Sequence, residues 1–184
     1  MKNIDRWNKV YEEKLYKHFR QFSEEELDKI LARFPHVKDL SASRQADAYD
    51  LGCGRGEFLL QLKKRNIRVY GVEISDEVKS HAHKEVKDLI EVSDLNHFNP
   101  HFSVDIIFLK FVIAFIEDDN FLRNLKPYIR EYGGIVILSP VGNIGEPAIP
   151  EEKLKKMFAG FNVEEEIWYQ GDGVKLSLFA LKSI

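Results

Sequence analysis

The sequence of 184 residues contains a single cysteine and no apolar run of the roughly 18 residues that a membrane-spanning helix needs. We therefore expect neither an intramolecular disulfide framework nor a membrane span. The chain also lacks a large excess of either charge, because 27 Lys and Arg residues nearly balance 30 Asp and Glu residues. The formal net charge of -3 argues against nucleic acid or an anionic membrane as partner. The segment MKNIDRWNKV lacks the apolar core of a signal peptide, so we expect a cytoplasmic protein.

Segments typical of strands alternate with segments typical of helices after about residue 45. The strand candidates are AYDLG, IRVYGVEI, DLIEV, VDIIFLKFVIAFI and GGIVILSP, and the helix candidates between and after them are EFLLQLKKRN, SDEVKSHAHKEVK, DDNFLRNLKPYIREY and EEKLKKMFAGF. This alternation predicts an α/β fold with a Rossmann-like, doubly wound, mostly parallel sheet. The stretches VEEEIWYQ and VKLSLFAL flank a Gly-Asp-Gly turn, which predicts a terminal hairpin and one antiparallel strand at a sheet edge.

The first 45 residues have a different pattern and predict two helices that pack on the sheet. Ser23 followed by Glu26 is a capping box for the second helix. In the first, apolar and aromatic residues recur at roughly helical spacing: Trp7, Val10, Tyr11, Phe19 and Phe22. We therefore expect one domain over residues 1–184, with a helical cap over 1–45 and a cofactor-binding α/β core over 46–184.

The most informative stretch is YDLGCGRGEF, residues 49–58, where three glycines follow the first core strand at alternate positions. In an open parallel sheet, ligands bind beyond the carboxyl ends of the strands, and this loop faces that crevice. Glycine allows unusual backbone angles and a close approach of a ligand to the main chain. The loop therefore predicts a ligand site.

The spacing of these glycines favours one class of ligand. A dinucleotide fingerprint reads G-x-G-x-x-G, but the slot for its third glycine is Glu57 here. The stretch DLGCGRGEF instead resembles the first motif of the class I S-adenosylmethionine-dependent methyltransferases, typically (D/E)-x-G-x-G-x-G. The resemblance covers the chain from about residue 49 to the carboxyl terminus and implies a seven-stranded sheet. It also implies S-adenosylmethionine as cofactor, bound along Asp50, Gly52, Cys53, Gly54 and Gly56.

Later strand ends add further candidate cofactor contacts. Glu73 closes the second strand, where one carboxylate can accept hydrogen bonds from both ribose hydroxyls. The resemblance places Ile74 against adenine, and Asp94 with Leu95 at the adenine edge. Lys110, at the end of the fourth strand, is a candidate for the methionine end or else a solvated strand terminus.

No set of nucleophile, base and orienting partner can be assembled from the sequence, so the catalytic residues are unknown. A sulfonium methyl group is already activated, and alignment with the acceptor can suffice. His97, His101 and Asp172 are candidate bases because we expect them in loops near strand carboxyl ends. The histidines do not supply the three or four ligands that a zinc site needs, so we expect no metal.

The resemblance implies an S-adenosylmethionine-dependent methyltransferase acting on a small-molecule acceptor by in-line displacement. One alternative is a cofactor-binding protein without turnover that supports a catalytic partner. The phenylalanine-rich stretch LKFVIAFIEDD keeps that alternative open, because it would suit either an occluded acceptor pocket or an apolar partner surface. A nicotinamide-dependent Rossmann oxidoreductase is the third possibility. The acceptor, the methylated atom and the oligomeric state are not readable from the sequence.

Overall fold

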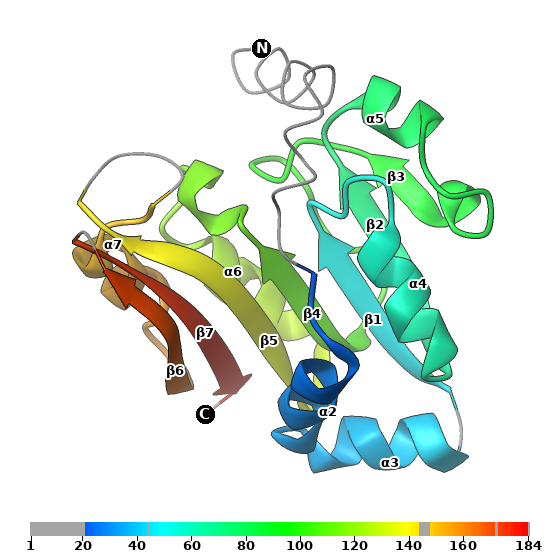
Figure 1. Cartoon of the computed structure of the whole chain (residues 1–184), viewed down its shortest axis with the longest axis horizontal. Helices are drawn as coiled ribbons and strands as arrows, with labels where there is room; N and C mark the ends of the chain where they lie inside the picture. The colour runs from blue at the N-terminus through cyan, green and yellow to red at the C-terminus, as the bar shows by residue number, and fades with distance from the viewer. Residues whose placement is uncertain (1–20, 44, 144–147, 172, 184) are drawn as a thin grey trace.

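The computed structural model describes residues 21–43, 45–143, 148–171 and 173–183. Their strands form a seven-stranded sheet in the order β3-β2-β1-β4-β5-β7-β6 (Figure 1). The strands are β1 (Ala46–Leu51), β2 (Ile67–Glu73), β3 (Ile90–Val92), β4 (Val104–Lys110), β5 (Ile129–Gly142), β6 (Phe161–Gly171) and β7 (Val174–Ser183). The α-helices are α2 (Glu24–Ala32), α3 (Pro35–Ser43), α4 (Glu57–Lys64), α5 (Asp76–Ser80), α6 (Phe121–Leu125) and α7 (Glu151–Met157).

The predicted doubly wound, mostly parallel sheet is confirmed. β1 lies between β2 and β4 and is parallel to both, while β3 extends the sheet beside β2 and β5 extends it beside β4. The strand order therefore reverses at β1. Such a switch point opens a crevice at the carboxyl ends of the strands, and here the crevice lies beyond the ends of β1 and β4.

The terminal hairpin is also confirmed, but its antiparallel strand does not lie at the sheet edge. β7 runs antiparallel to both β5 and β6 and lies between them, so β6 forms the edge. The reason is hydrophobicity: Leu178, Ala180 and Leu181 of β7 are fully buried, whereas most of β6 is exposed. The more apolar strand takes the inner position.

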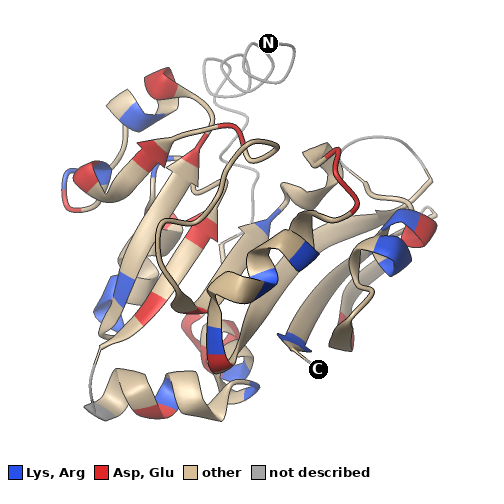
Figure 2. Cartoon of the chain, turned by 180° about the vertical axis from the view of Figure 1, so that it is seen from behind, with Lys and Arg blue, Asp and Glu red and all other residues tan. Residues whose placement is uncertain are grey.

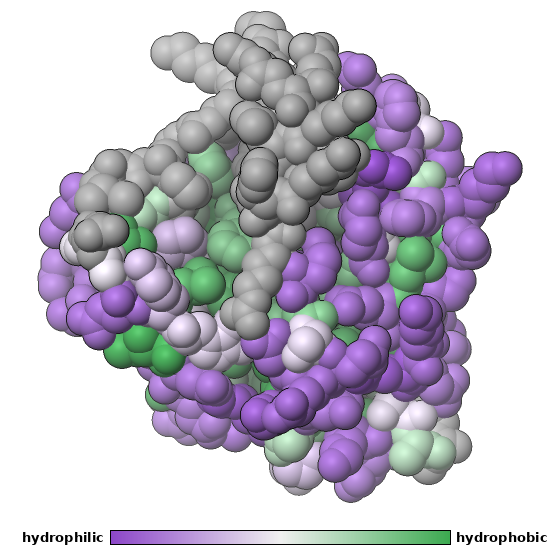
Figure 3. All heavy atoms as spheres, in the orientation of Figure 1, coloured by the Kyte–Doolittle hydropathy of each residue, from purple (hydrophilic) through white to green (hydrophobic). Residues whose placement is uncertain are grey.

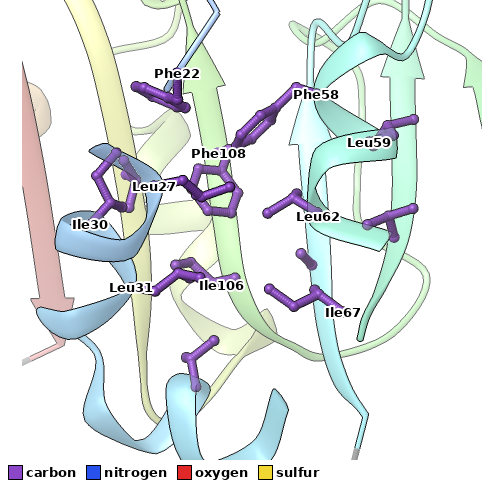
Figure 4. Close-up of a cluster of buried hydrophobic side chains, with 14 of the residues drawn as sticks. Phe22, Leu27, Ile30, Leu31, Phe58, Leu59, Leu62, Ile67, Ile106 and Phe108 are labelled. Atoms are coloured by element: carbon purple, nitrogen blue, oxygen red, sulfur yellow. The ribbon is translucent and has the colours of Figure 1, made fainter. Parts of the chain in front are cut away.

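Apolar side chains cover both faces of the sheet. On one face, α2 and α4 pack over β1 and β4, and Phe22, Leu27, Phe58 and Phe108 belong to one buried cluster (Figure 4). The Phe22 and Phe58 rings meet edge to face with centroids 5.2 Å apart. On the other face, buried side chains of α6 and α7 join a second cluster with β4 and β5. The sheet is therefore covered by packed side chains on both of its faces.

Several predicted elements have different limits in the structure. The apolar run from residue 104 to 116 is a strand only as far as Lys110, because Phe111 has a φ of 59° and a 3-10 turn, Ile113–Phe115, follows. The predicted helix over residues 118–132 is also shorter. α6 ends at Leu125, a 3-10 turn containing Pro127 follows, and β5 begins at Ile129. The predicted capping box of Ser23 and Glu26 at α2 is confirmed.

An ion network ties four strands together at the amino ends, opposite the crevice. Buried Asp47 of β1 pairs with Arg68 of β2 and Arg130 of β5, and Arg130 also lies 2.9 Å from Asp105 of β4. Burial alone would raise the pKa of Asp47, but the two guanidinium groups outweigh it and hold that pKa below its ordinary value. The four residues help to line a pocket of about 450 Å³. Because each arginine already has a carboxylate partner, we assign this network to the fold.

Acidic and basic residues are interspersed along the described chain (Figure 2). Hydrophilic residues dominate the outward side of α4 and α5, and apolar patches lie toward β5 to β7 (Figure 3). Within the described ranges, none of the helices combines the length and the apolar character that a bilayer span needs.

Candidate functional site

The glycine loop connects β1 to α4 at the carboxyl edge of the sheet. The amides of Gly52 and Cys53 donate to Val72 O at 2.8 and 2.9 Å, which fixes the loop against β2. Gly52, Gly54 and Gly56 have φ values of +80°, +57° and +85°, a backbone region in which side chains are strained. The backbone at these three alternate positions therefore favours glycine irrespective of any ligand.

Two of the glycines also make room for the protein's own side chains. A Cβ atom on Gly52 would lie 2.3 Å from Val112 Cγ1, and one on Gly56 would lie 2.5 Å from Val86 Cγ2. The sequence interpretation attributed the missing side chains to a ligand. At Gly52 and Gly56 the structure corrects that physical reason, because a valine packs directly on each glycine.

The side chain of Glu57, which stands where a dinucleotide site would have its third glycine, points to the surface. Its Oε1 atom lies 3.5 Å from His83 Nε2 and 4.0 Å from Arg55 Nε. The start of α4 is therefore held by a surface ion pair.

Glu73 lies at the tip of β2, next to the glycine loop, and is only 6% exposed. Its Oε2 accepts from the Gly54 amide and its Oε1 from the Ser75 amide, both at 3.0 Å. Burial raises the pKa of Glu73, and these backbone hydrogen bonds oppose that rise. A carboxylate offers about four acceptor positions, so Glu73 fixes the loop and retains capacity for a hydroxyl donor of a ligand.

Asp50 and Lys110 form a second charged feature under the loop. Asp50 is fully buried, and neither of its carboxyl oxygens has a hydrogen-bond partner among the described residues. Burial raises the pKa of Asp50 from 3.8 to about 6, and nearby Lys110 opposes the rise. Lys110 is partly buried, and burial lowers the pKa of its ammonium group against the pull of Asp50.

The stability of the ligand-free protein is expected to fall as pH rises from about 4 to about 6. Folded Asp50 keeps its proton up to about pH 6, whereas the unfolded group releases it near 3.8, so the stability it contributes at low pH is lost as pH rises through this window. A pKa difference of about two corresponds to roughly 3 kcal/mol, of which about 2 kcal/mol falls between about pH 4.5 and about pH 7.5.

Urea unfolding of the wild type and of Asp50→Asn at these two pH values measures the effect. The wild type should lose about 2 kcal/mol relative to the variant. An equal pH dependence of the two proteins would show that Asp50 does not titrate in this range.

Cys53 is buried within the loop, and a Cβ atom on Gly71 of β2 would lie 2.6 Å from its Sγ. Burial raises the pKa of the Cys53 thiol well above its ordinary value, and the Asp50 and Glu73 carboxyls reinforce the rise. The thiol is therefore protonated and packs against β2.

The remaining candidate contacts lie after β2 and β3. Ile74 and Leu95 are partly buried. Asp94 Oδ1 accepts from the backbone amide of Asn96 at 3.0 Å and from its side-chain amide at 3.1 Å, which is the geometry of a turn. Asn96, which the sequence interpretation missed, also accepts from the Glu117 amide at 2.8 Å. Asn96 thus connects the loops after β3 and β4, and no sequence pattern predicts this long-range contact.

Among the described residues, the contacts of the candidate bases His97 and His101 are with groups outside the glycine loop. His97 is exposed in the turn after Asp94. His101 lies in the loop between β3 and β4, and its Nε2 atom is 2.8 Å from Glu91 Oε2 of β3. Asp172 lies outside the described residues, as do the aromatic residues of the first predicted helix, Trp7, Tyr11 and Tyr16. In the described ranges, no three His, Cys, Asp or Glu side chains gather as metal ligands would.

A family model described as a methyltransferase domain matches residues 49–137, from the end of β1 into β5. Among curated proteins, the chain is similar to malonyl-(acyl-carrier protein) O-methyltransferase 1 of Ilyobacter polytropus, with 28% identity over 136 residues, which is 71% of this chain. The match covers 49% of that protein, so the chain spans about half the length of the curated relative it matches.

Solved structures show the same fold. An S-adenosylmethionine-dependent methyltransferase from Clostridium acetobutylicum has a TM-score of 0.65 at 12% identity, covering 98% of both chains. Magnesium protoporphyrin IX methyltransferase from Synechocystis, solved with bound S-adenosylmethionine, has a TM-score of 0.60 at 15% identity, covering 98% of this chain and 91% of that chain. At these identities the likeness concerns the fold.

The sheet order, the terminal hairpin and the glycine loop after β1 together define a Rossmann-like methyltransferase fold. The fold and the family match over residues 49–137 make the chain similar to the class I S-adenosylmethionine-dependent methyltransferases. S-adenosylmethionine is the methyl donor of that class.

Proposed function

We propose that this chain binds S-adenosylmethionine at the glycine loop and transfers its methyl group to a small-molecule acceptor. The observation that carries the proposal is the family match over residues 49–137, which includes the loop, Glu73 and Lys110. The buried Asp50 carboxylate, which lacks a donor among the described residues, gives independent support. Such a carboxylate fits a ligand that carries an ammonium group, and the methionine portion of the cofactor has one.

The proposed contacts follow the carboxyl ends of the strands. Glu73 accepts from the ribose hydroxyls, and Ile74 lies against adenine. Asp94 and Leu95 read the adenine edge. The main chain from Gly52 to Gly56, with Cys53 packed beneath it, adjoins the ribose and methionine portions, and Asp50 accepts from the methionine ammonium. Lys110 belongs to the methionine end of the same site.

In this proposal the role of the chain is to position the cofactor for methyl transfer. S-adenosylmethionine supplies a methyl group on a positively charged sulfonium, which makes the methyl group ready for in-line displacement. The loop and Glu73 hold the nucleoside, and the packed layers on both faces of the sheet keep water from the methyl group. No side chain is proposed as general base.

The acceptor is proposed to be a small molecule because the relatives' names point that way. The Ilyobacter polytropus relative is named for malonyl-(acyl-carrier protein), and the Synechocystis structure for magnesium protoporphyrin IX. Each of these acceptors belongs to the protein that is named for it. For this chain they support a search among carboxylates and other oxygen acceptors.

A thermal unfolding assay tests cofactor binding. S-adenosylhomocysteine at about 100 times its Kd is expected to stabilise the protein by about 2.7 kcal/mol, because it binds the folded state alone. NAD at the same concentration serves as the control and is expected to leave the midpoint unchanged. Stabilisation by NAD with no response to S-adenosylhomocysteine would contradict the proposal.

A turnover assay separates the enzyme from a binding subunit without turnover. The assay follows release of S-adenosylhomocysteine while acceptor compounds are screened. Release with at least one acceptor is expected, and the Asp50→Asn variant is the matched control because it removes the carboxylate charge while keeping the side-chain shape. Binding with no release across carboxylate, hydroxyl, amine and thiol acceptors would favour the non-catalytic alternative.

A further inference from the structure

The side-chain amide of Asn96 connects two loops at the carboxyl edge of the sheet, the turn after β3 and the loop after β4. Its Nδ2 donates to Asp94 Oδ1 at 3.1 Å, and its Oδ1 accepts from the Glu117 amide at 2.8 Å. A longer contact of 3.5 Å joins the same Nδ2 to Phe115 O. Asn96 is partly buried, whereas Glu117 is exposed. Because one amide group has a partner at each end, it holds the two loops at a fixed separation.

The hydrogen bonds of Asn96 also determine which oxygen of Asp94 is left for a ligand. Asp94 Oδ1 accepts from the backbone amide and from the side-chain amide of Asn96, at 3.0 and 3.1 Å. No described residue donates to Oδ2. A carboxylate has about four acceptor positions, so two donors on Oδ1 restrict rotation of the group and leave Oδ2 to accept from a ligand or from water.

The loop from Phe111 to Glu117 is held at both ends by segments of the proposed cofactor site. Near its start, Val112 packs on the glycine loop, where a Cβ atom on Gly52 would lie 2.3 Å from Val112 Cγ1. Its end donates to Asn96. Val112 and Leu95 also pack against the same buried cluster. A ligand that contacts both the glycine loop and the turn after β3 therefore acts on both ends of this loop.

Resting on the proposed function, we infer that Asn96 is a positioning residue with two roles. It orients Asp94 Oδ2 toward the exocyclic amine of adenine, and through the Glu117 amide it couples cofactor binding to the loop after β4. A donor on Oδ2 restricts Asp94, and Asp94 in turn restricts Asn96. The loop then loses less conformational entropy when Asn96 holds it. The loop after β4 is therefore held more firmly with the cofactor bound than without it.

Two ligands that differ only in the exocyclic amine test the first role by isothermal titration calorimetry. One is S-adenosylhomocysteine, and the other is its purine analogue with hydrogen in place of the amine. The wild type is expected to bind S-adenosylhomocysteine about 10- to 100-fold more tightly, the usual value of a hydrogen bond to a charged group. Asn96→Ala should reduce this ratio to less than about threefold, because the Asp94 carboxylate then rotates and no longer aims at the amine.

Hydrogen exchange at the Glu117 amide, followed by NMR, tests the second role. In the wild type, saturation with S-adenosylhomocysteine is expected to slow this exchange about 2- to 10-fold, the range for strengthening one hydrogen bond. In Asn96→Ala the same saturation should leave the exchange rate unchanged. Slowing of equal size in the variant would overturn the inference, because the ligand would then act on the loop without Asn96.

Asn96→Asp separates the two ends of the amide. It keeps an acceptor for the Glu117 amide, but it replaces the donor to Asp94 with a carboxylate oxygen, and like charges repel. We therefore expect Asn96→Asp to lose the preference for S-adenosylhomocysteine as Asn96→Ala does. Its Glu117 amide should stay at least as protected as in the ligand-free wild type. Loss of that protection together with the preference would indicate local unfolding of the turn and overturn the inference.

Asn124→Ala is the matched control, because the Asn124 side chain also donates to a carboxylate, Asp118 Oδ2 at 3.2 Å, but joins residues only six positions apart. It should leave the ratio of the two affinities unchanged. An unchanged ratio in Asn96→Ala would overturn the inference. Equal weakening of both ligands in that variant would identify a purely structural role and overturn it as well.

The wild type separates this inference from the proposed function. If it binds both ligands with equal affinity, Asp94 does not contact the adenine amine, and the role of Asn96 is wrong while the proposed function stands. If neither ligand binds the wild type, the proposed function itself is wrong and the inference falls with it.

Discussion

Gly52→Ala is expected to destabilise the protein by about 2–5 kcal/mol in urea unfolding. Two costs add at this position. A φ of +80° strains any residue with a Cβ atom, at about 1–2 kcal/mol. The new methyl group would also lie 2.3 Å from Val112 Cγ1, and such overpacking costs about 1–3 kcal/mol.

Gly160→Ala isolates the first cost. Gly160 has a φ of +90°, but a Cβ atom there meets nothing within 4 Å, so only the backbone strain applies. A loss of about 1–2 kcal/mol is expected for this control. Adding Val112→Ala to Gly52→Ala should restore part of the difference, because it removes the atom that the new methyl group meets. Equal losses of unfolding free energy in Gly52→Ala and Gly160→Ala would show that a steric contact with Val112 does not contribute to the cost at Gly52.

Glu73→Ala is expected to weaken binding of S-adenosylhomocysteine by about 1.5–3 kcal/mol, which is the value of hydrogen bonds to a charged group. The change removes the proposed ribose acceptor. It also leaves the buried amides of Gly54 and Ser75 without their carboxylate, so the loop loses its link to the tip of β2. Isothermal titration calorimetry measures the affinity.

The same substitution should weaken 5′-methylthioadenosine to a similar degree, because that ligand keeps the ribose. Asp76→Ala is the control, since Asp76 lies exposed in the first turn of α5, three residues from Glu73. Unchanged affinity for both ligands in Glu73→Ala would remove the ribose assignment.

The candidate site was readable from the sequence where it depends on local spacing. The loop from Gly52 to Gly56 is identified by glycine positions alone, since each needs a backbone region that other residues avoid. Glu73 was placed by its position at the end of a strand. The contacts that decide what these residues do came from elsewhere in the chain, as with Val112 on Gly52 and Val86 on Gly56.

The limits of elements were less predictable where the composition stayed apolar. Nothing in the composition of the run from residue 104 to 116 marks Phe111 as the point where β4 stops, because a buried strand and a buried turn use the same residues. The bridge from Asn96 to Glu117 likewise joins segments that the sequence leaves independent.

The sequence by itself determined the alternation of strands and helices, the terminal hairpin and the glycine loop, because these depend on periodicity and on the backbone freedom of single residues. Only the tertiary structure decided that β7 lies inside the sheet, that valines cover two of the glycines, and that the Asp50 carboxyl is buried with no hydrogen-bond donor among the described residues. Burial and charge pairing depend on which segments meet across the sheet, and that information is not local to any stretch of the chain.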